Sequence, residues 1–147
     1  KNGAKIFVDF AHTPDALKSV LKSVRSHFIG KIHLIFGAGG NRDIGKRSIM
    51  GKIASKLSDR VIITDDNPRF ENPSKIRSQI IKFCPKAIEI ADRSEAILTG
   101  VDQLKNGDAL IIAGKGHENF QIYGNNEYPF NDSEEASFAI EALGEKL

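Results

Sequence analysis

Short apolar runs alternate with amphipathic helical patterns along almost the whole chain, and this alternation constrains the fold more than any other feature. The apolar runs have the length and composition of strands buried in a sheet: Lys5–Asp9, Ile32–Phe36, Val61–Thr64, Ala87–Ile90 and Ala109–Ala113. Strict alternation of strands and helices gives a parallel sheet with helices on both faces. The sequence therefore predicts one α/β domain over residues 1–147, with a Rossmann-like open and mostly parallel sheet.

Capping residues and prolines mark where the helices begin. Thr13 and Asn72 each precede a proline, an order that suits an N-cap followed by the first helical residue. Asp132 is expected to cap the final helix. Ile49 and Phe138 belong to apolar stripes that are expected to face the core. Helices are predicted from 13–14 onward, over 46–57, from 72 to about 83, over 94–104 and from 132 onward.

One further strand is predicted close to the C-terminus. Phe120–Tyr123 is apolar and aromatic, and the turn-forming sequence Gly124-Asn125-Asn126 follows it. A strand that ends in such a turn is expected to be antiparallel to its neighbour. The sheet is therefore expected to be mostly rather than wholly parallel.

Composition and charge exclude several classes of function. The net charge is +2 and there is no long basic run, so nucleic-acid binding has little electrostatic support. No apolar segment approaches the ~20 residues that span a bilayer, so no membrane segment is expected. The single cysteine, Cys84, rules out an internal disulfide and fits a reducing, cytoplasmic location. Because the chain begins Lys-Asn-Gly rather than with Met, we expect it to be an excised part of a longer protein.

Polar residues are concentrated in four loops, each of which directly follows a predicted strand. These loops are Asp9–His12, Gly37–Arg47, Asp65–Arg69 and Gly114–Glu118. The carboxyl ends of parallel strands meet at one edge of an open sheet, and ligands bind at that edge. We therefore expect the four loops to contribute to one binding site.

The loop after the third predicted strand carries groups suited to an amino acid. Asp66 can accept a hydrogen bond from an ammonium group, and Asn67 can both donate and accept. Arg69 can bind a carboxylate through two parallel hydrogen bonds. Pro68 fixes its own φ and keeps Asn67 out of helical conformation, so the turn is shaped in advance. Together these residues suit a zwitterion with a free carboxylate.

The glycine-rich loop Gly37–Asp43 does not match a complete phosphate-binding motif. Arg42 occupies the place of the third glycine in a dinucleotide-binding pattern. The segment from Gly40 to Lys46 is closer to a Walker A loop, but Arg47 stands where a Ser or Thr would hold magnesium. What remains is a glycine turn whose basic side chains can attract carboxylates or phosphates. For Lys46, a solvated position at the start of a helix is an equally simple interpretation.

The remaining two loops leave alternatives open. Gly114–Glu118 contains two glycines, which allow the backbone to approach a ligand closely, although a tight surface turn is an alternative. His117 and Glu118 are too few for a metal site, and no nucleophile with a recognisable signature accompanies them. Asp9 either binds ribose hydroxyls or caps the following helix. His27 is expected at the end of a helix and His33 at the edge of a strand, neither of them as a ligand.

Taken together, the motifs resemble those of the carboxy-terminal domain of the Mur ligases. They are DFAHTPDAL, FGAGGNRDIGKR, DRVIITDDNPR, AGKGHE and a closing acidic helix, in the order and spacing of that family and over essentially the whole chain. The DNPR form is associated with the branch that attaches meso-diaminopimelate, and lysine-adding relatives lack its arginine. This difference has a physical basis, because diaminopimelate carries a second carboxylate that lysine lacks.

The resemblance implies a role for individual residues. Diaminopimelate would be held by Arg42, Asp66, Asn67, Pro68, Arg69, Gly114 and Glu118. The residues that face the nucleotide would be Asp9, His12, Lys46 and Arg47. No metal ligand is expected in this domain. Family members use ATP and Mg²⁺ to activate the carboxylate of a UDP-MurNAc-dipeptide as an acyl phosphate, which the incoming amine attacks.

The resemblance also implies that this chain does not act alone. The amino-terminal domain that holds the UDP-sugar and the central ATP-binding domain of the family have no counterpart in these residues. The isolated chain is therefore expected to select the amino acid without catalysing ligation. Two alternatives remain: a self-contained NTPase built on the Walker-like loop, and a non-catalytic module that binds a small acid.

Overall fold

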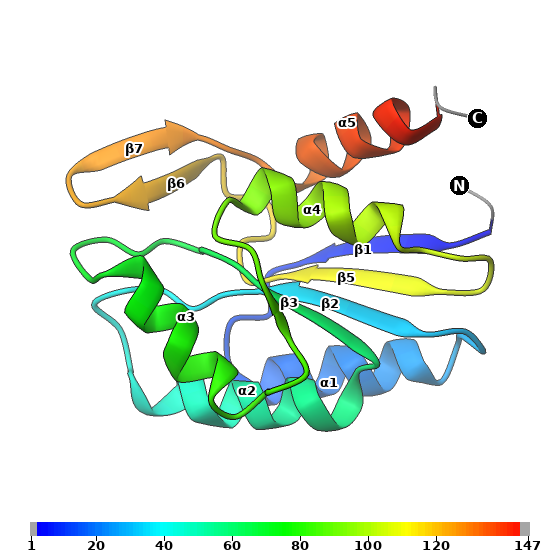
Figure 1. Cartoon of the computed structure of the whole chain (residues 1–147), viewed down its shortest axis with the longest axis horizontal. Helices are drawn as coiled ribbons and strands as arrows, with labels where there is room; N and C mark the ends of the chain where they lie inside the picture. The colour runs from blue at the N-terminus through cyan, green and yellow to red at the C-terminus, as the bar shows by residue number, and fades with distance from the viewer. Residues whose placement is uncertain (1–2, 145–147) are drawn as a thin grey trace.

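A parallel sheet of five strands runs through the middle of the molecule (Figure 1). The computed structural model describes residues 3–144. The strand order is β1-β5-β2-β3-β4, and every neighbouring pair is parallel. The strands are β1 (Lys5–Asp9), β2 (Ile32–Phe36), β3 (Arg60–Ile63), β4 (Ile88–Glu89) and β5 (Ala109–Ala113). The predicted α/β fold is confirmed, and three of the strands have the predicted bounds.

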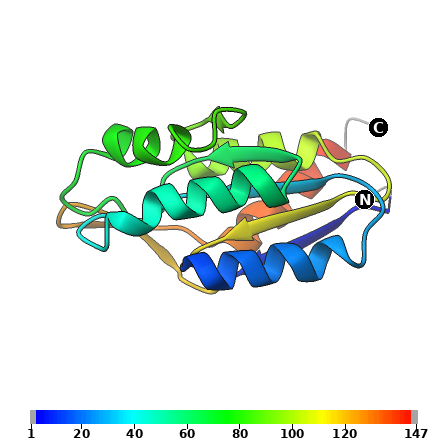
Figure 2. The same ribbon diagram turned by 90° about the horizontal axis from the view of Figure 1, so that it is seen from below.

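Helices cover both faces of this sheet (Figures 1 and 2). On one face lie α1 (Pro14–Arg25), α2 (Gly45–Leu57) and α3 (Pro73–Ile81). On the other face lie α4 (Arg93–Asp102) and α5 (Asp132–Gly144). Each face has its own apolar core, and alternate residues of a strand contribute to different cores. Leu34, for example, packs toward α1 and α2, whereas Ile35 packs toward α4.

A small antiparallel hairpin stands apart from the main sheet. It consists of β6 (Phe120–Tyr123) and β7 (Asn126–Pro129), and it projects beyond the carboxyl ends of the parallel strands (Figure 1). The antiparallel strand predicted at Phe120–Tyr123 is confirmed, and the structure adds its partner. The edge of β6 is bonded to the loop after β3, because Arg69 N–H donates to the Ile122 carbonyl at 3.0 Å.

The helix starts are mostly those that the capping residues predict. The Thr13 hydroxyl accepts from Ala16 N–H at 3.2 Å, and the Asn72 side chain accepts from Ser74 N–H at 3.0 Å. Asp132, by contrast, does not cap α5. It is the first residue of that helix, and its carboxylate is bonded to the guanidinium of Arg93. The strong preference of aspartate for caps therefore gave the wrong role at this position.

Two side chains lie in environments that differ from those predicted. Ile49 and Phe138 are 49% and 61% exposed although both were expected to face the core. In α2 the inward stripe instead contains an arginine and a glycine, which an apolar pattern cannot reveal: Arg47, Met50, Gly51 and Ala54. His33 is the second residue of β2, near the beginning of the strand as expected, and its Nε2 lies 2.9 Å from Asp108 Oδ2.

Arg93 joins the two halves of the fold through a buried network. Its Nε and Nη2 donate to the two carboxylate oxygens of Asp132, each at 2.8 Å. Its remaining N–H groups reach the carbonyls of Asp65 and Ala113, both at 3.1 Å. Neither the Arg93 nor the Asp132 side chain has any exposed surface. One guanidinium thus connects α4 and α5 to the ends of β3 and β5.

We expect Asp132→Asn to lower the free energy of unfolding by about 3–5 kcal/mol, because it leaves a buried guanidinium without its counter-charge. Urea denaturation at neutral pH measures this loss. The matched control is Arg25→Gln, which breaks the 2.7 Å pair with Asp59 on the surface, where the two side chains are 44% and 39% exposed. Its cost is expected to be at most about 1 kcal/mol. Equal losses in the two variants would contradict the importance assigned to the buried pair.

Candidate functional site

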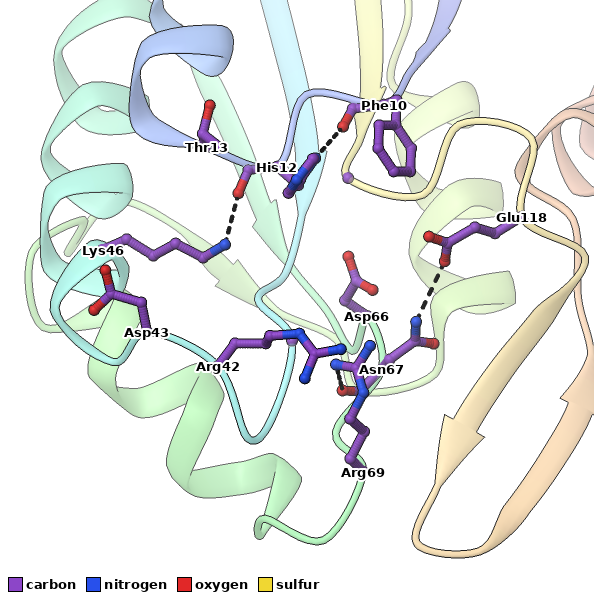
Figure 3. A pocket seen from close by; sticks show the side chains of 12 residues that line it. Phe10, His12, Thr13, Arg42, Asp43, Lys46, Asp66, Asn67, Arg69 and Glu118 are labelled. Atoms are coloured by element: carbon purple, nitrogen blue, oxygen red, sulfur yellow. Dashed lines mark hydrogen bonds between the residues drawn. The ribbon is translucent and has the colours of Figure 1, made fainter.

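The four polar loops do meet at the carboxyl edge of the sheet, where they enclose a pocket of about 400 Å³ (Figure 3). The pocket contains side chains from the loops after β1, β2, β3 and β5. Its lining consists of Phe10, His12, Thr13, Gly39, Arg42, Asp43, Lys46, Asp66, Asn67, Arg69, Gly114 and Glu118. Most of the predicted site residues are therefore brought together, and those outside the lining are Asp9, Pro68 and Arg47.

Arg47 corrects one prediction, because it does not face the site. Its guanidinium is buried and makes two 3.0 Å hydrogen bonds to the Glu71 carboxylate. It also donates to Gln79 at 2.8 Å and to the Gly39 carbonyl at 3.0 Å. The hydrogen bonds from Arg47 lower the pKa of Glu71. Arg47 lies on the inward stripe of α2, so it holds the glycine-rich loop in place and is not available to a nucleotide.

Pro68 and Asp9 shape the loops through short-range contacts. A Cβ on Gly40 would lie 1.7 Å from the Pro68 carbonyl oxygen, so only glycine permits these two loops to touch. Gly40 N–H donates to the Asn67 carbonyl at 2.8 Å across the same contact. The Asp9 carboxylate accepts from Ala11 N–H at 2.8 Å and so bends the chain after β1. The cap of α1 is Thr13, which removes the alternative that Asp9 caps this helix.

Two guanidinium groups lie beside each other on one side of the pocket (Figure 3). Arg69 has a left-handed backbone with φ of 55°, and its Nη1 donates to the Gly40 carbonyl at 3.0 Å. Arg42 is exposed, and its Nη1 donates to the Asn41 carbonyl at 3.1 Å. Both residues line the pocket, and each guanidinium has N–H groups beyond the one that makes this bond. Adjacent cations of this kind favour an anion with two acceptor oxygens, such as a carboxylate.

Asp66 supplies a negative charge within the same pocket. Its side chain is only 8% exposed, and no group among residues 3–144 donates a hydrogen bond to its carboxylate. Burial raises the pKa of this carboxyl, although the nearby charges of Arg93 and Lys115 oppose the rise. A Cβ at Gly114, where φ is +111°, would lie 2.7 Å from Asp66 Oδ2. The pocket therefore contains a carboxylate without a hydrogen-bond donor among these residues, and position 114 must be glycine because a side chain there would clash with it.

Lys115 and Arg93 are the two residues of this region that sequence reasoning missed. Both are charged side chains that the structure buries completely, and nothing in the sequence marks them as buried. Lys115 Nζ donates to Asn67 Oδ1 at 2.9 Å and to Glu118 Oε1 at 3.1 Å. Asn67 Nδ2 in turn lies 3.3 Å from Glu118 Oε1. Asn67 and Glu118 are thus parts of one network before any ligand binds.

The far end of the pocket is lined by basic groups at the start of α2. Lys46 Nζ donates to the His12 carbonyl at 2.9 Å, which ties the loop after β1 to this helix (Figure 3). The His12 ring packs edge-on against Phe10, with 4.6 Å between centroids. The positive end of α2 lies beside these groups, and such an end attracts anions. Contact between this region and a nucleotide stays a prediction.

Residues 3–144 contain neither a metal centre nor a membrane-spanning helix. No group of three or more His, Cys, Asp or Glu side chains is arranged to hold a metal ion in that range. Across the same residues, no helix combines the length and the apolarity that crossing a membrane requires.

The fold and the pocket together define a class: a parallel α/β domain whose ligand pocket, at the carboxyl edge of the sheet, carries both signs of charge. Within that class, the chain belongs to the Mur ligase family, because residues 1–116 match the model of the Mur ligase glutamate ligase domain.

Similar proteins agree with this assignment. The chain is 53% identical to the UDP-N-acetylmuramoyl-L-alanyl-D-glutamate--2,6-diaminopimelate ligase of Brucella melitensis over 142 residues, which are 97% of this chain. It is equally similar to the ligase of that name from Agrobacterium fabrum, over 100% of this chain. A solved structure of a ligase with that name superposes with a TM-score of 0.91 at 40% identity, covering 98% of this chain and 31% of the other.

The chain spans only about 30% of the length of these relatives, 29% of the Brucella protein and 30% of the Agrobacterium protein. A more distant structure shares the fold alone, at 17% identity and a TM-score of 0.60. It is a folylpolyglutamate synthase/dihydrofolate synthase from Yersinia pestis complexed with AMPPNP and a manganese ion, and it covers 95% of this chain and 28% of its own. At least one protein that contains this fold therefore binds an ATP analogue and a metal ion.

We expect Asp66→Asn to stabilise the domain, by an amount that depends on pH. Because burial raises the pKa of Asp66, the folded chain holds a proton that the unfolded chain releases. This carboxyl therefore reduces stability as pH rises from its ordinary pKa to the raised one. The difference in unfolding free energy between variant and unaltered protein should grow across that interval and stay constant above it.

Urea denaturation at a series of pH values measures that difference. Asp102→Asn, at an exposed position, is the matched control and should show no such dependence. A difference for Asp66→Asn that does not change with pH would contradict the raised pKa.

Proposed function

We propose that this chain is the amino-acid-binding part of an ATP-dependent ligase that adds meso-diaminopimelate to UDP-N-acetylmuramoyl-L-alanyl-D-glutamate in peptidoglycan synthesis. The observation that carries the proposal is the pairing, within one pocket, of two adjacent guanidinium groups with an unpaired buried carboxylate. The relatives at 53% identity support it, because they are named for this reaction.

The charges of the pocket complement those of the proposed substrate. Diaminopimelate has a carboxylate and an ammonium group at each end. In the proposal, Arg42 and Arg69 bind a carboxylate, while Asp66 and Glu118 accept hydrogen bonds from an ammonium group. Gly114 brings its carbonyl close enough to help orient the ligand. Lysine has the same ammonium groups but only one carboxylate, so it leaves part of the arginine pair without a partner.

We assign contact with the nucleotide to one end of the pocket, and we assign no metal to this chain. ATP supplies the phosphoryl group that activates the carboxylate of the second substrate. The exposed ring of His12 and the ammonium of Lys46 lie at the positive end of α2, so they suit a phosphate. Residues 3–144 offer no cluster of metal ligands, and we assign Mg²⁺ to the other parts of the whole ligase.

In this proposal the chain selects and orients the attacking amine. It presents that amine to an activated carboxylate held elsewhere in the ligase and excludes water from the reaction. The isolated chain is therefore expected to hold the amino acid without forming the amide bond. We place the reaction in the cytoplasm, in keeping with Cys84, which is buried and forms no disulfide.

We expect Arg69→Ala in the whole ligase to reduce kcat/KM for diaminopimelate by the equivalent of about 2–4 kcal/mol, because a charged contact with two hydrogen bonds is lost. The preference for diaminopimelate over lysine should narrow in parallel. Steady-state kinetics with both amino acids measure these effects.

Arg69→Lys is the matched control, since alanine and lysine place the same Cβ at the left-handed position. It keeps the charge but not the paired donors, so its activity should lie between those of the alanine variant and the unaltered ligase. An unchanged kcat/KM for diaminopimelate in Arg69→Ala would refute the role of this arginine. Equal use of lysine by the unaltered ligase would refute the substrate assignment itself.

A further inference from the structure

Lys115 is a fully buried cation that the proposed ligand set does not include. Its side chain has no exposed surface, although it lies only one residue from the pocket lining. All three ammonium protons have acceptors within the protein: Asn67 Oδ1 at 2.9 Å, Glu118 Oε1 at 3.1 Å and the Phe120 carbonyl at 2.8 Å. A buried ammonium is costly unless it is satisfied in this way. Lys115 therefore joins two pocket side chains to the first residue of the hairpin.

The contacts of Asn67 determine which way its amide faces. Asn67 Oδ1 accepts from Lys115 and also from the backbone N–H of Ile122, at 3.0 Å. Both neighbours can only donate, so the oxygen must lie on their side and the nitrogen on the other. Asn67 Nδ2 then lies toward Glu118 and the pocket. Asn67 can therefore only donate to a ligand, although an asparagine side chain can in general both donate and accept.

The contacts of Glu118 leave it one oxygen for a ligand. Oε1 accepts from Lys115 and Asn67, whereas no group among the described residues donates to Oε2. The Glu118 side chain is 38% exposed, so without Lys115 little would fix its direction. Its only remaining contact would be the long one, 3.3 Å, from Asn67 Nδ2.

We propose that Lys115 is a positioning residue for the amino-acid pocket: it fixes Asn67 as a donor toward a ligand carboxylate and Glu118 as a single acceptor toward a ligand ammonium. This inference rests on the proposed function and deepens it. Lys115 does not touch the amino acid. It determines which end of a zwitterion each neighbouring side chain can bind.

Lys115 also acts on Asp66 through its charge. The groups that act on the Asp66 carboxyl are the cations Arg93 and Lys115 and the carboxylates Glu118 and Asp132. Burial raises the pKa of Asp66, and the two cations lower it. Binding of a ligand ammonium needs ionised Asp66, so affinity should rise with pH through this pKa. Removing the charge of Lys115 should shift that rise to higher pH.

The test is a double-mutant cycle in the whole ligase, with Lys115→Met, Glu118→Gln and the double variant. We expect Lys115→Met to raise KM for diaminopimelate about tenfold or more, with a smaller change in kcat, because Glu118 is no longer held. The KM of the double variant should rise by less than the product of the two single effects, since both changes remove the contact between Lys115 and Glu118, whereas the contact with Asn67 is lost with Lys115 alone. The acid limb of the pH profile of kcat/KM should move to higher pH in Lys115→Met. Lys105→Met, at an exposed lysine, is the matched control and should change none of these quantities.

Several outcomes would overturn the inference. They are a KM in Lys115→Met equal to that of the unaltered ligase, effects that multiply in the double variant, or an unmoved acid limb. Each of these leaves the proposed function intact as long as the unaltered ligase prefers diaminopimelate to lysine. A ligase without that preference would overturn the proposed function first.

A second variant decides the matter if Lys115→Met does not fold. Asn67→Asp retains an oxygen for Lys115 and for Ile122 N–H but has no Nδ2 donor. Its new carboxylate is buried and faces Glu118, so the melting temperature should fall, and KM is measured below it. Its KM for diaminopimelate should rise about tenfold, since a ligand carboxylate would meet an acceptor instead of a donor. An unchanged KM would overturn the assignment of Asn67 as a donor set by Lys115.

Discussion

The burial of two cations at the carboxyl edge of the sheet is the constraint on which the rest of this structure depends. Arg93 lies beneath the pocket and bonds the carbonyls at the ends of two strands, together with the first carboxylate of α5. Lys115 lies beside the pocket and bonds Asn67, Glu118 and the start of the hairpin. Loops at such an edge are usually the least constrained part of an α/β fold. Here the loops are held in place by Arg93 and Lys115, because a buried cation that loses its hydrogen-bond acceptors is costly.

The sequence is sufficient to predict most of the fold because the fold depends on local patterns. A strand buried on both faces must be apolar throughout, and β5 (Ala109–Ala113) shows this without ambiguity. Thr13 and Asn72 mark helix starts because their side chains bond the N–H groups a few residues ahead. The role of Asp132 could not be predicted in this way. Its partner Arg93 is 39 residues distant in the sequence, and a residue in the first helical turn looks like a cap whether or not it acts as one.

The candidate site was predictable only in its outline. Topology alone brings Arg42, Asp66 and Glu118 to one edge of the sheet, since loops at the carboxyl ends of parallel strands must converge. What topology does not fix is which polar side chains face the pocket. Arg47 has a side chain that could bind an anion, but its position on the inward stripe of α2 buries it. Lys115 is also buried, although it lies between two glycines in a loop. Burial of a charge depends on partners that are distant in sequence, so local patterns cannot reveal it.

The attachment of Arg69 to the hairpin has a consequence for how such a pocket can diverge. The left-handed backbone of Arg69 is held by two main-chain hydrogen bonds to the hairpin, one to the Ile122 carbonyl of β6 and one from Gly124 N–H in the turn. The main chain of the hairpin therefore fixes the backbone of Arg69, and the Gly40 carbonyl accepts from its guanidinium. Substitution of an exposed hairpin side chain such as Tyr128 would leave these main-chain bonds in place. An insertion or deletion in the turn, in contrast, would move the backbone of Arg69, so the length of the hairpin bears on the specificity of the pocket.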